Sequence, residues 1–231
     1  IFLLSFLAWL SSRSIKLSIG TAISFFVIGY FGMWKDTMST MAIISVATLI
    51  CLVIGTPIGV LMARSERLKN ILSPVLDMMQ TIPTFVYLIP IIMLLGIGKV
   101  PGLLAVCVYA IPPIVRLTNL GIREVDRRVV EAAKALGIKK RIILFKIEIP
   151  LALPSIMTGV NQTIMMALAM VVIASMIGVS GLGVPILRSI SNQFLALGLM
   201  NGLAIVALAI IFDRISQNYA RRIQKHKEAK K

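Results

Sequence analysis

A charged segment between two apolar ones constrains this sequence more than any other feature. The segment runs from Glu131 to Pro150, and the residues on either side, 102–121 and 151–178, are largely apolar over lengths that can cross a membrane. Eleven of the 24 Lys and Arg residues lie in the segment, just before it, or in the short basic loop 64–69. This pattern predicts a loop at the membrane surface with a membrane span on each side of it.

The overall composition is that of a membrane protein. Hydrophobic residues make up 58% of the 231 positions and charged residues only 14%, whereas about a quarter of an average soluble domain is charged. The net charge of +15 does not indicate nucleic-acid binding, because the basic residues lie in short loops and a tail and do not alternate with aromatic residues.

The sequence also lacks the patterns of an enzyme. It contains no phosphate-binding G-x-x-x-x-G-K-[ST] loop, no cluster of His and Glu with metal-ligand spacing, and no plausible catalytic triad. Cys51 and Cys107 lie in apolar spans and are interpreted as small hydrophobic residues. We therefore expect no catalytic residue, metal or cofactor on this chain.

Six complete membrane spans are predicted, which makes the fold that of an all-α integral membrane protein. Residues 1–11 are too few to cross a bilayer and are interpreted as the end of a further span whose beginning is missing. The complete spans are 17–34, 38–63, 78–97, 102–121, 151–178 and 196–213.

The distribution of basic residues sets the orientation of these spans. If the charged loop is cytoplasmic and the spans alternate, only Lys35, Lys99 and Arg188 lie on the opposite side, against the other 21 Lys and Arg residues. Basic residues accumulate on the cytoplasmic side of membrane proteins, so this topology is favoured. The chain then divides into N-terminal spans at 1–37, a core at 38–214 that contains the loop 122–150, and a basic cytoplasmic tail at 215–231.

The loop is predicted to be a short helix followed by a sharp stop. Apolar residues recur at three- and four-residue intervals over 124–136 and give one helical face: Val125, Val129, Ala132 or Ala133, and Leu136. Gly137 stands where a helix prefers a left-handed residue, and a basic return strand or turn leads from it to Pro150. The alternatives are a basic amphipathic helix on anionic lipid and a solvated loop.

Seven positions of the loop match the signature E-A-A-x-x-x-G-x(9)-I-x-L-P of ABC importer permeases. They are Glu131, Ala132, Ala133, Gly137, Ile147, Ile149 and Pro150, with Ile149 in the place of the usual Leu. The loop therefore resembles the site at which such a permease docks on its ATPase. The resemblance implies this coupling role for Glu131, Ala132, Ala133, Gly137, Ile147 and Pro150.

The resemblance extends over residues 38–214. Segments 77–102, 109–122 and 154–178, with the turn at 181–183, are similar to the permeases of glycine betaine, proline betaine, carnitine and choline ABC importers. This similarity implies a type I ABC importer permease fold in the bacterial cytoplasmic membrane, and uptake of quaternary ammonium osmolytes for osmoprotection. It also implies partners: a second permease copy, two ATPase subunits that bind ATP and magnesium, and a periplasmic or surface-tethered substrate-binding protein.

Two adjacent amides in the fifth predicted span, Asn161 and Gln162, are candidates for the translocation pathway. An unpaired amide is costly inside a membrane, so each is expected either to bond to a neighbouring helix or to line a polar path. Asn161 is assigned to the path, because Thr158 and Met165 lie three and four residues from it. Gln162 is assigned to a hydrogen bond between helices.

Other functions are less consistent with the sequence. A secondary transporter needs ionisable residues within the membrane, and only Asp77 and Arg116 come near it, at the cytoplasmic edge. A membrane scaffold would not require the signature spacing. Within the ABC class, a permease for another small solute, such as methionine, is the alternative.

Overall fold

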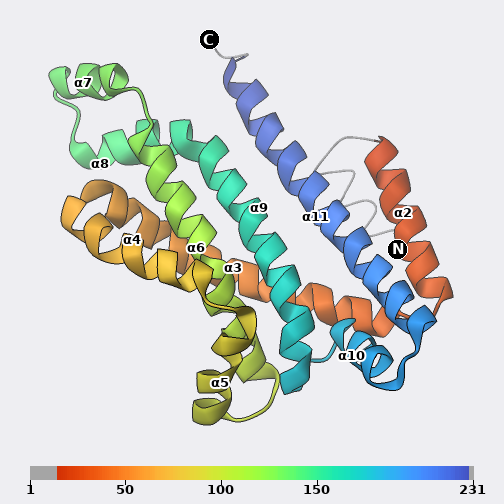
Figure 1. Cartoon of the computed structure of the whole chain (residues 1–231). Coiled ribbons are helices and arrows are strands. Elements are labelled where there is room, and N and C mark those ends of the chain that lie inside the picture. Colours follow the sequence, from red (N-terminus) through yellow and green to blue (C-terminus); the bar gives the residue numbers. More distant parts are fainter. Residues whose placement is uncertain (1–14, 229–231) are drawn as a thin grey trace.

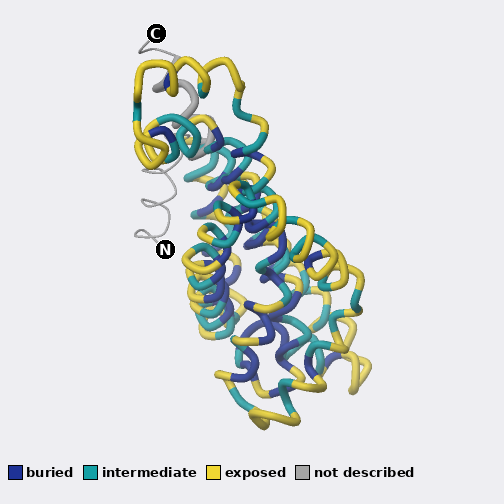
Figure 2. Tube along the Cα trace, turned by 90° about the vertical axis from the view of Figure 1, so that its left-hand side faces the viewer, coloured by how far each residue is buried: buried dark blue, intermediate teal, exposed yellow. Residues whose placement is uncertain are grey.

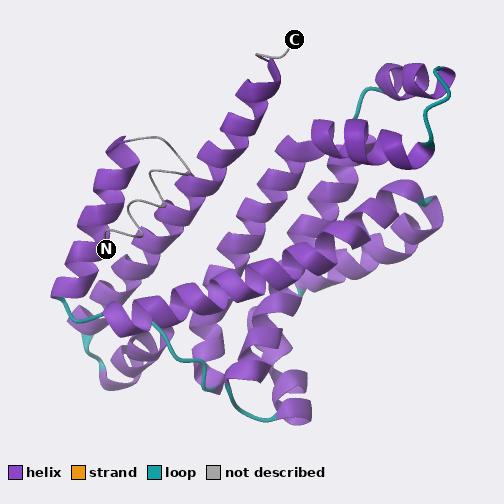
Figure 3. Cartoon of the chain, turned by 180° about the vertical axis from the view of Figure 1, so that it is seen from behind, coloured by secondary structure: helices purple, strands orange, loops and turns teal. Residues whose placement is uncertain are grey.

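The computed structural model describes residues 15–228, and within that range it contains helices and loops but no strand (Figures 1 and 3). The expected partial span at residues 1–11 lies outside the described residues. The long helices are α3 (Trp34–Arg64), α6 (Lys99–Arg123), α9 (Ile149–Ala174) and α11 (Leu195–Glu228). The shorter ones are α2 (Ile15–Tyr30), α4 (Glu66–Thr81), α5 (Thr84–Leu95), α7 (Arg127–Ala135), α8 (Lys140–Ile143) and α10 (Gly183–Asn192).

Four stretches of helix in the described residues are long and apolar enough to cross a membrane. They are Trp34–Arg64, Lys99–Arg123, Lys140–Ile177 and Leu195–Asn218. The third stretch includes α8, a π-helical turn at Leu144–Glu148, α9 and a 3₁₀ turn at Ser175–Ile177. The sequence predicts these four crossings correctly, because each rests on a long apolar run.

The other two predicted spans differ in the structure. Helices α4 and α5 are bent by 101° where they meet, so the span expected at 78–97 is at most a broken one. The break has a local cause: Ile82 is extended, with φ −67° and ψ 128°, and the residue before a proline, here Pro83, is disfavoured in helical geometry. Helix α2 ends at Tyr30, four residues before the predicted end of its span, and a short turn separates it from α3.

Helix α6 lies at the centre of the bundle and packs against α3 on one side and α9 on the other (Figure 1). Glycines bring the backbones close together. A Cβ added to Gly59 of α3 would lie 2.6 Å from the carbonyl oxygen of Val115 on α6. A Cβ added to Gly159 of α9 would lie 3.2 Å from the Cα of Ile114. Small residues at helix contacts are what allows membrane helices to pack tightly.

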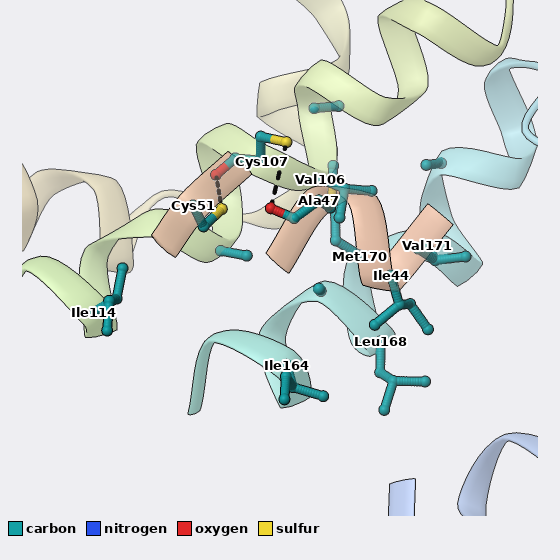
Figure 4. Packing of buried hydrophobic residues seen from close by; sticks show 14 of the residues in the cluster. Ile44, Ala47, Cys51, Val106, Cys107, Ile114, Ile164, Leu168, Met170 and Val171 are labelled. Atoms are coloured by element: carbon teal, nitrogen blue, oxygen red, sulfur yellow. Dashed lines mark hydrogen bonds between the residues drawn. The ribbon is translucent and has the colours of Figure 1, made fainter. Parts of the chain in front are cut away.

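A cluster of buried hydrophobic residues fills the interior of this three-helix unit (Figure 4), and Figure 2 shows how buried and exposed residues are distributed along the chain. Cys51 and Cys107 are free and buried within this cluster. Each thiol donates a weak hydrogen bond to a carbonyl of the opposite helix: Cys51 Sγ to the oxygen of Cys107 at 3.4 Å, and Cys107 Sγ to the oxygen of Ala47 at 3.9 Å (Figure 4). The two cysteines thus pack between α3 and α6 as small residues, in agreement with the sequence interpretation.

The two ends of the bundle carry different short helices. Helices α7 and α8 lie at the same end as the C-terminal part of α11, whereas α5 and α10 lie at the opposite end (Figure 1). The sequence does not predict α10. At that end the N–H of Leu182 donates to Oγ1 of the buried Thr40, 2.9 Å away, which ties the turn before α10 to the start of α3.

Replacing Gly59 with alanine should destabilise the bundle. The added methyl group would overlap the backbone of α6, and overpacking of this kind costs about 1–3 kcal/mol. Thermal unfolding of the purified chain in detergent measures the effect. Gly202 of α11 is the matched control, because no atom lies within 4 Å of its Cβ position. Equal melting temperatures for Gly59→Ala and Gly202→Ala would contradict the close approach of α3 and α6.

Candidate functional site

The first part of the candidate site is the loop that carries α7. The helix begins at Asp126, whose carboxylate accepts a hydrogen bond of 2.9 Å from the N–H of Arg128. It ends at Gly137, which has φ +71°. The N–H of Gly137 donates to the oxygen of Lys134, and the N–H of Ile138 donates to that of Ala133. This pair of bonds is the Schellman motif, which requires a left-handed residue, so the predicted helix stop is confirmed.

The segment that returns to the membrane is helical, not the strand or turn expected from the sequence. Helix α8 and the π-helical turn Leu144–Glu148 lead directly into α9. The sequence did not predict a helix here because the three consecutive basic residues Lys139–Arg141 are typical of a solvated loop. Ile147 and Pro150 of the signature are only partly exposed within this helical return.

Arg64, at the end of α3, anchors the returning segment to the bundle. Its guanidinium donates to Oε2 of Glu148 at 2.8 Å and to the backbone oxygen of Lys140 at 3.4 Å. A second brace is Arg123 at the end of α6, which pairs with Glu66 of α4 and donates to the oxygen of Met62 at 2.9 Å. Arg64 therefore fastens the returning segment to α3, and Arg123 fastens the start of the loop to α3 and α4.

The apolar face expected at 124–136 packs on the rest of the chain only in part, because Val125 lies against the hydrophobic core. Ala133 is buried, but Val129 is 42% exposed and Leu136 is 79% exposed. Phe145, in the returning segment, is 58% exposed. Glu131 and Ala132 are exposed as well. The signature residues at the helix thus lie on a charged surface that also presents apolar side chains.

The second part of the site lies along α9, and there Asn161 forms the bond to a neighbouring helix that was expected of Gln162. Asn161 faces α11: its Nδ2 donates to Oδ1 of Asp213 at 2.8 Å, and its Oδ1 accepts from the hydroxyl of Ser216 at 2.6 Å. Gln217 donates to the same Asp213 oxygen at 2.7 Å. Asn161 is thus the residue that bonds between helices, the role expected of Gln162.

Gln162 lies on the face of α9 that the rest of the described chain leaves uncovered. Thr158, Gln162, Met165 and Ala169 are all exposed and follow one another at intervals of three or four residues. Thr158 and Met165 therefore share a face with Gln162 and not with Asn161. Successive residues of a helix point about 100° apart, so the bond from Asn161 to α11 turns Gln162 away from that helix.

A polar pocket of about 500 Å³ lies beside Gln162, between α4, α6 and α9. Asp77 of α4 and Arg116 of α6 form an ion pair in its wall. Its polar lining consists of Ser73, Asp77, Gln80, Arg116, Asn119 and Gln162. In the described residues no group of His, Cys, Asp or Glu is placed to hold a metal ion.

These features define a multi-pass membrane protein with a helical loop at one end and polar groups between its helices. The chain belongs to the family of binding-protein-dependent transport system inner membrane components, which matches residues 55–225. This family membership accounts for the signature in the loop, since the match includes it.

Two relatives illustrate the similarity. The glycine betaine/proline betaine transport system permease protein ProW of Salmonella typhimurium is 50% identical over 96% of this chain. The glycine betaine transport system permease protein OpuAB of Bacillus subtilis is 43% identical over 91% of it. The chain spans 62% of the length of the first relative and 74% of the second.

The fold is also that of a solved structure. An inward-facing structure of the MetNI methionine ABC transporter superposes with a TM-score of 0.74, over 82% of this chain and 94% of that one, at 20% sequence identity. This confirms the predicted type I ABC importer permease fold.

Replacing Asn161 with leucine should destabilise the contact between α9 and α11. The carboxylate of Asp213 would keep only Gln217 as a partner and the hydroxyl of Ser216 only the backbone oxygen of Asp213, and losing a hydrogen bond to a charged group costs about 1.5–3 kcal/mol. The melting temperature of the purified chain in detergent should fall for Asn161→Leu. It should change little for Gln162→Leu, because the Gln162 side chain is exposed and, within the described residues, forms no hydrogen bond to α11. A larger fall in melting temperature for Gln162→Leu than for Asn161→Leu would instead indicate that Gln162 forms the bond between helices, as expected from the sequence.

Proposed function

We propose that this chain is the permease subunit of an ATP-driven importer for glycine betaine or a related quaternary ammonium osmolyte. The observation that carries the proposal is the helical loop, which combines the permease signature with an exposed apolar surface at one end of the bundle. The names of the relatives supply the substrate class. The importer would serve osmoprotection in the bacterial cytoplasmic membrane.

The loop has the properties of a docking element for a soluble partner. Leu136 and Val129 expose apolar surface beside charged residues, and burying such surface against a partner is favourable. The Schellman motif fixes the end of α7, and Arg64 and Arg123 connect the loop region to the core. A displacement of α7 by an ATPase would therefore be transmitted to α3, α6 and α9. ATP and magnesium would bind to that separate ATPase chain.

A second permease copy would complete the pathway. The uncovered face of α9 presents Thr158, Gln162 and Met165, which is a polar and adaptable surface. In the membrane such a face is expected to meet another helix or a polar path. We infer that two copies of this chain place these faces around a common route. A substrate-binding protein on the outer side would select the solute and deliver it to that route.

Gly137→Val tests both the transport activity and the coupling role. Valine at φ +71° is strained by roughly 1–2 kcal/mol, so the end of α7 should rearrange. The permease, an ATPase subunit and a binding protein of a glycine betaine system would be reconstituted in proteoliposomes. ATP-dependent accumulation of radiolabelled glycine betaine is expected for the unmodified chain and should be lost in the variant.

The matched control is Gly32→Val. Gly32 has φ +73° and open space around its Cβ position, but it lies between α2 and α3, far from α7 in the sequence. The control should lose some stability and retain coupled uptake. Normal uptake by Gly137→Val would end the coupling assignment, and no accumulation by the unmodified chain would end the proposed activity.

Met165→Cys tests the dimer. Met165 is 38% exposed on the uncovered face of α9, whereas its neighbour Ile164 is 9% exposed. Oxidation in membranes that contain the complete transporter should link two Met165→Cys chains into a dimer on a non-reducing gel. Ile164→Cys should not cross-link, and the native Cys51 and Cys107 are buried and should stay unreactive. Dimers from Ile164→Cys alone, or from neither variant, would exclude this arrangement of two copies.

A further inference from the structure

The pocket between α4, α6 and α9 contains both charges that a zwitterion would need. Asp77 and Arg116 are paired in its wall, yet their side chains remain 61% and 36% exposed. Arg116 is seven residues before Arg123, the last residue of α6, so it lies about 10 Å along the helix from that end. Arg116 is therefore set back inside a membrane-spanning helix, and Asp77 reaches it from the neighbouring α4.

The ion pair with Asp77 does not use all the hydrogen-bond donors of the Arg116 guanidinium. The Nε of Arg116 is buried and has no hydrogen-bond partner in the structure. Guanidinium groups bind carboxylates best through two parallel N–H bonds. The contact with Asp77 joins Nη2 to one carboxylate oxygen, so donor capacity remains for a second carboxylate.

The remaining polar lining is neutral. Ser73 and Gln80 of α4 and Gln162 of α9 contribute hydroxyl and amide groups. The charges of Asp77 and Arg116 cancel, so the pocket matches a solute whose own charges cancel. Gln162 also belongs to the uncovered face of α9, which places the pocket beside the proposed route.

We propose that this pocket is a transient binding site for a zwitterionic solute with a carboxylate and a cationic nitrogen. Arg116 receives the carboxylate and Asp77 attracts the cation, each exchanging its present partner for the solute. An ion pair that is this exposed contributes little to stability, so the exchange costs little. The lining contains no aromatic ring, so the cation is held by charge and not by cation–π attraction. Such a site binds weakly, which suits a solute in passage.

This inference rests on the proposed function for the identity of the solute, and a labelling experiment separates the two. Ser73→Cys places a thiol in the pocket wall of the assembled transporter. Its rate of reaction with a water-soluble maleimide is measured with glycine betaine, with choline, with sodium acetate and with sucrose. At a concentration of about twice the Kd, glycine betaine should slow labelling about threefold by mass action. The cation, the anion and the neutral solute should each have much less effect.

Three variants control this result. Ser39→Cys, outside the pocket near the other end of α3, should label at the same rate with every solute. Adding Arg116→Gln to Ser73→Cys should abolish protection by glycine betaine. Adding Arg116→Lys keeps the charge but not the two-pronged donor, and should raise the concentration needed for protection about tenfold, the effect of losing one charge-assisted bond. Size-exclusion profiles verify that each variant remains assembled.

The outcomes distinguish the pocket from the transport activity. Equal protection by choline or acetate, or protection that persists in Arg116→Gln, overturns the zwitterion site. Absence of protection in a complex that accumulates glycine betaine also overturns it, while the proposed function stands. If the complex does not accumulate glycine betaine but another zwitterion, such as methionine, protects the thiol in an Arg116-dependent way, the pocket stands and the proposed substrate fails.

Discussion

The close approach of α3, α6 and α9 is the constraint on which the rest of the structure depends. Gly59 and Gly159 allow the backbones to meet on both sides of α6, and the apolar interior forms around these contacts. In a membrane, where apolar burial adds little between helices, such packing is a main source of association. Arg64 and Arg123, at the ends of α3 and α6, also fasten the two ends of the loop, so the docking surface depends on the core as well.

The sequence determines the elements that depend on composition and local geometry. The four long crossings follow from apolar runs, and the left-handed Gly137 follows from a helix that must stop within a charged loop. The sequence also predicts the end of the bundle at which the charged loop lies, because the basic residues gather at the end that carries α7 and α8. These properties need no knowledge of distant partners.

Other features depend on residues that are distant in the sequence, or on a choice between two local structures that the sequence permits equally. A proline within an apolar span can kink it or break it, and at Pro83 the chain bends by 101°. The rotation of α9 is fixed by Asp213, which is 52 residues from Asn161. The sequence interpretation placed Asp213 at the end of a span, but α11 continues to Glu228. The carboxylate therefore lies within a helix, where it can receive the amide.

The bonds between Asn161 and α11 also fix how the two helices can move. Asp213 and Ser216 occupy adjacent positions on one side of α11, and each bonds to a different atom of the same amide. A slide of α11 by one turn, about 5.4 Å, would break both bonds and leave the carboxylate against apolar side chains. Helices α9 and α11 are therefore expected to move together as one rigid unit.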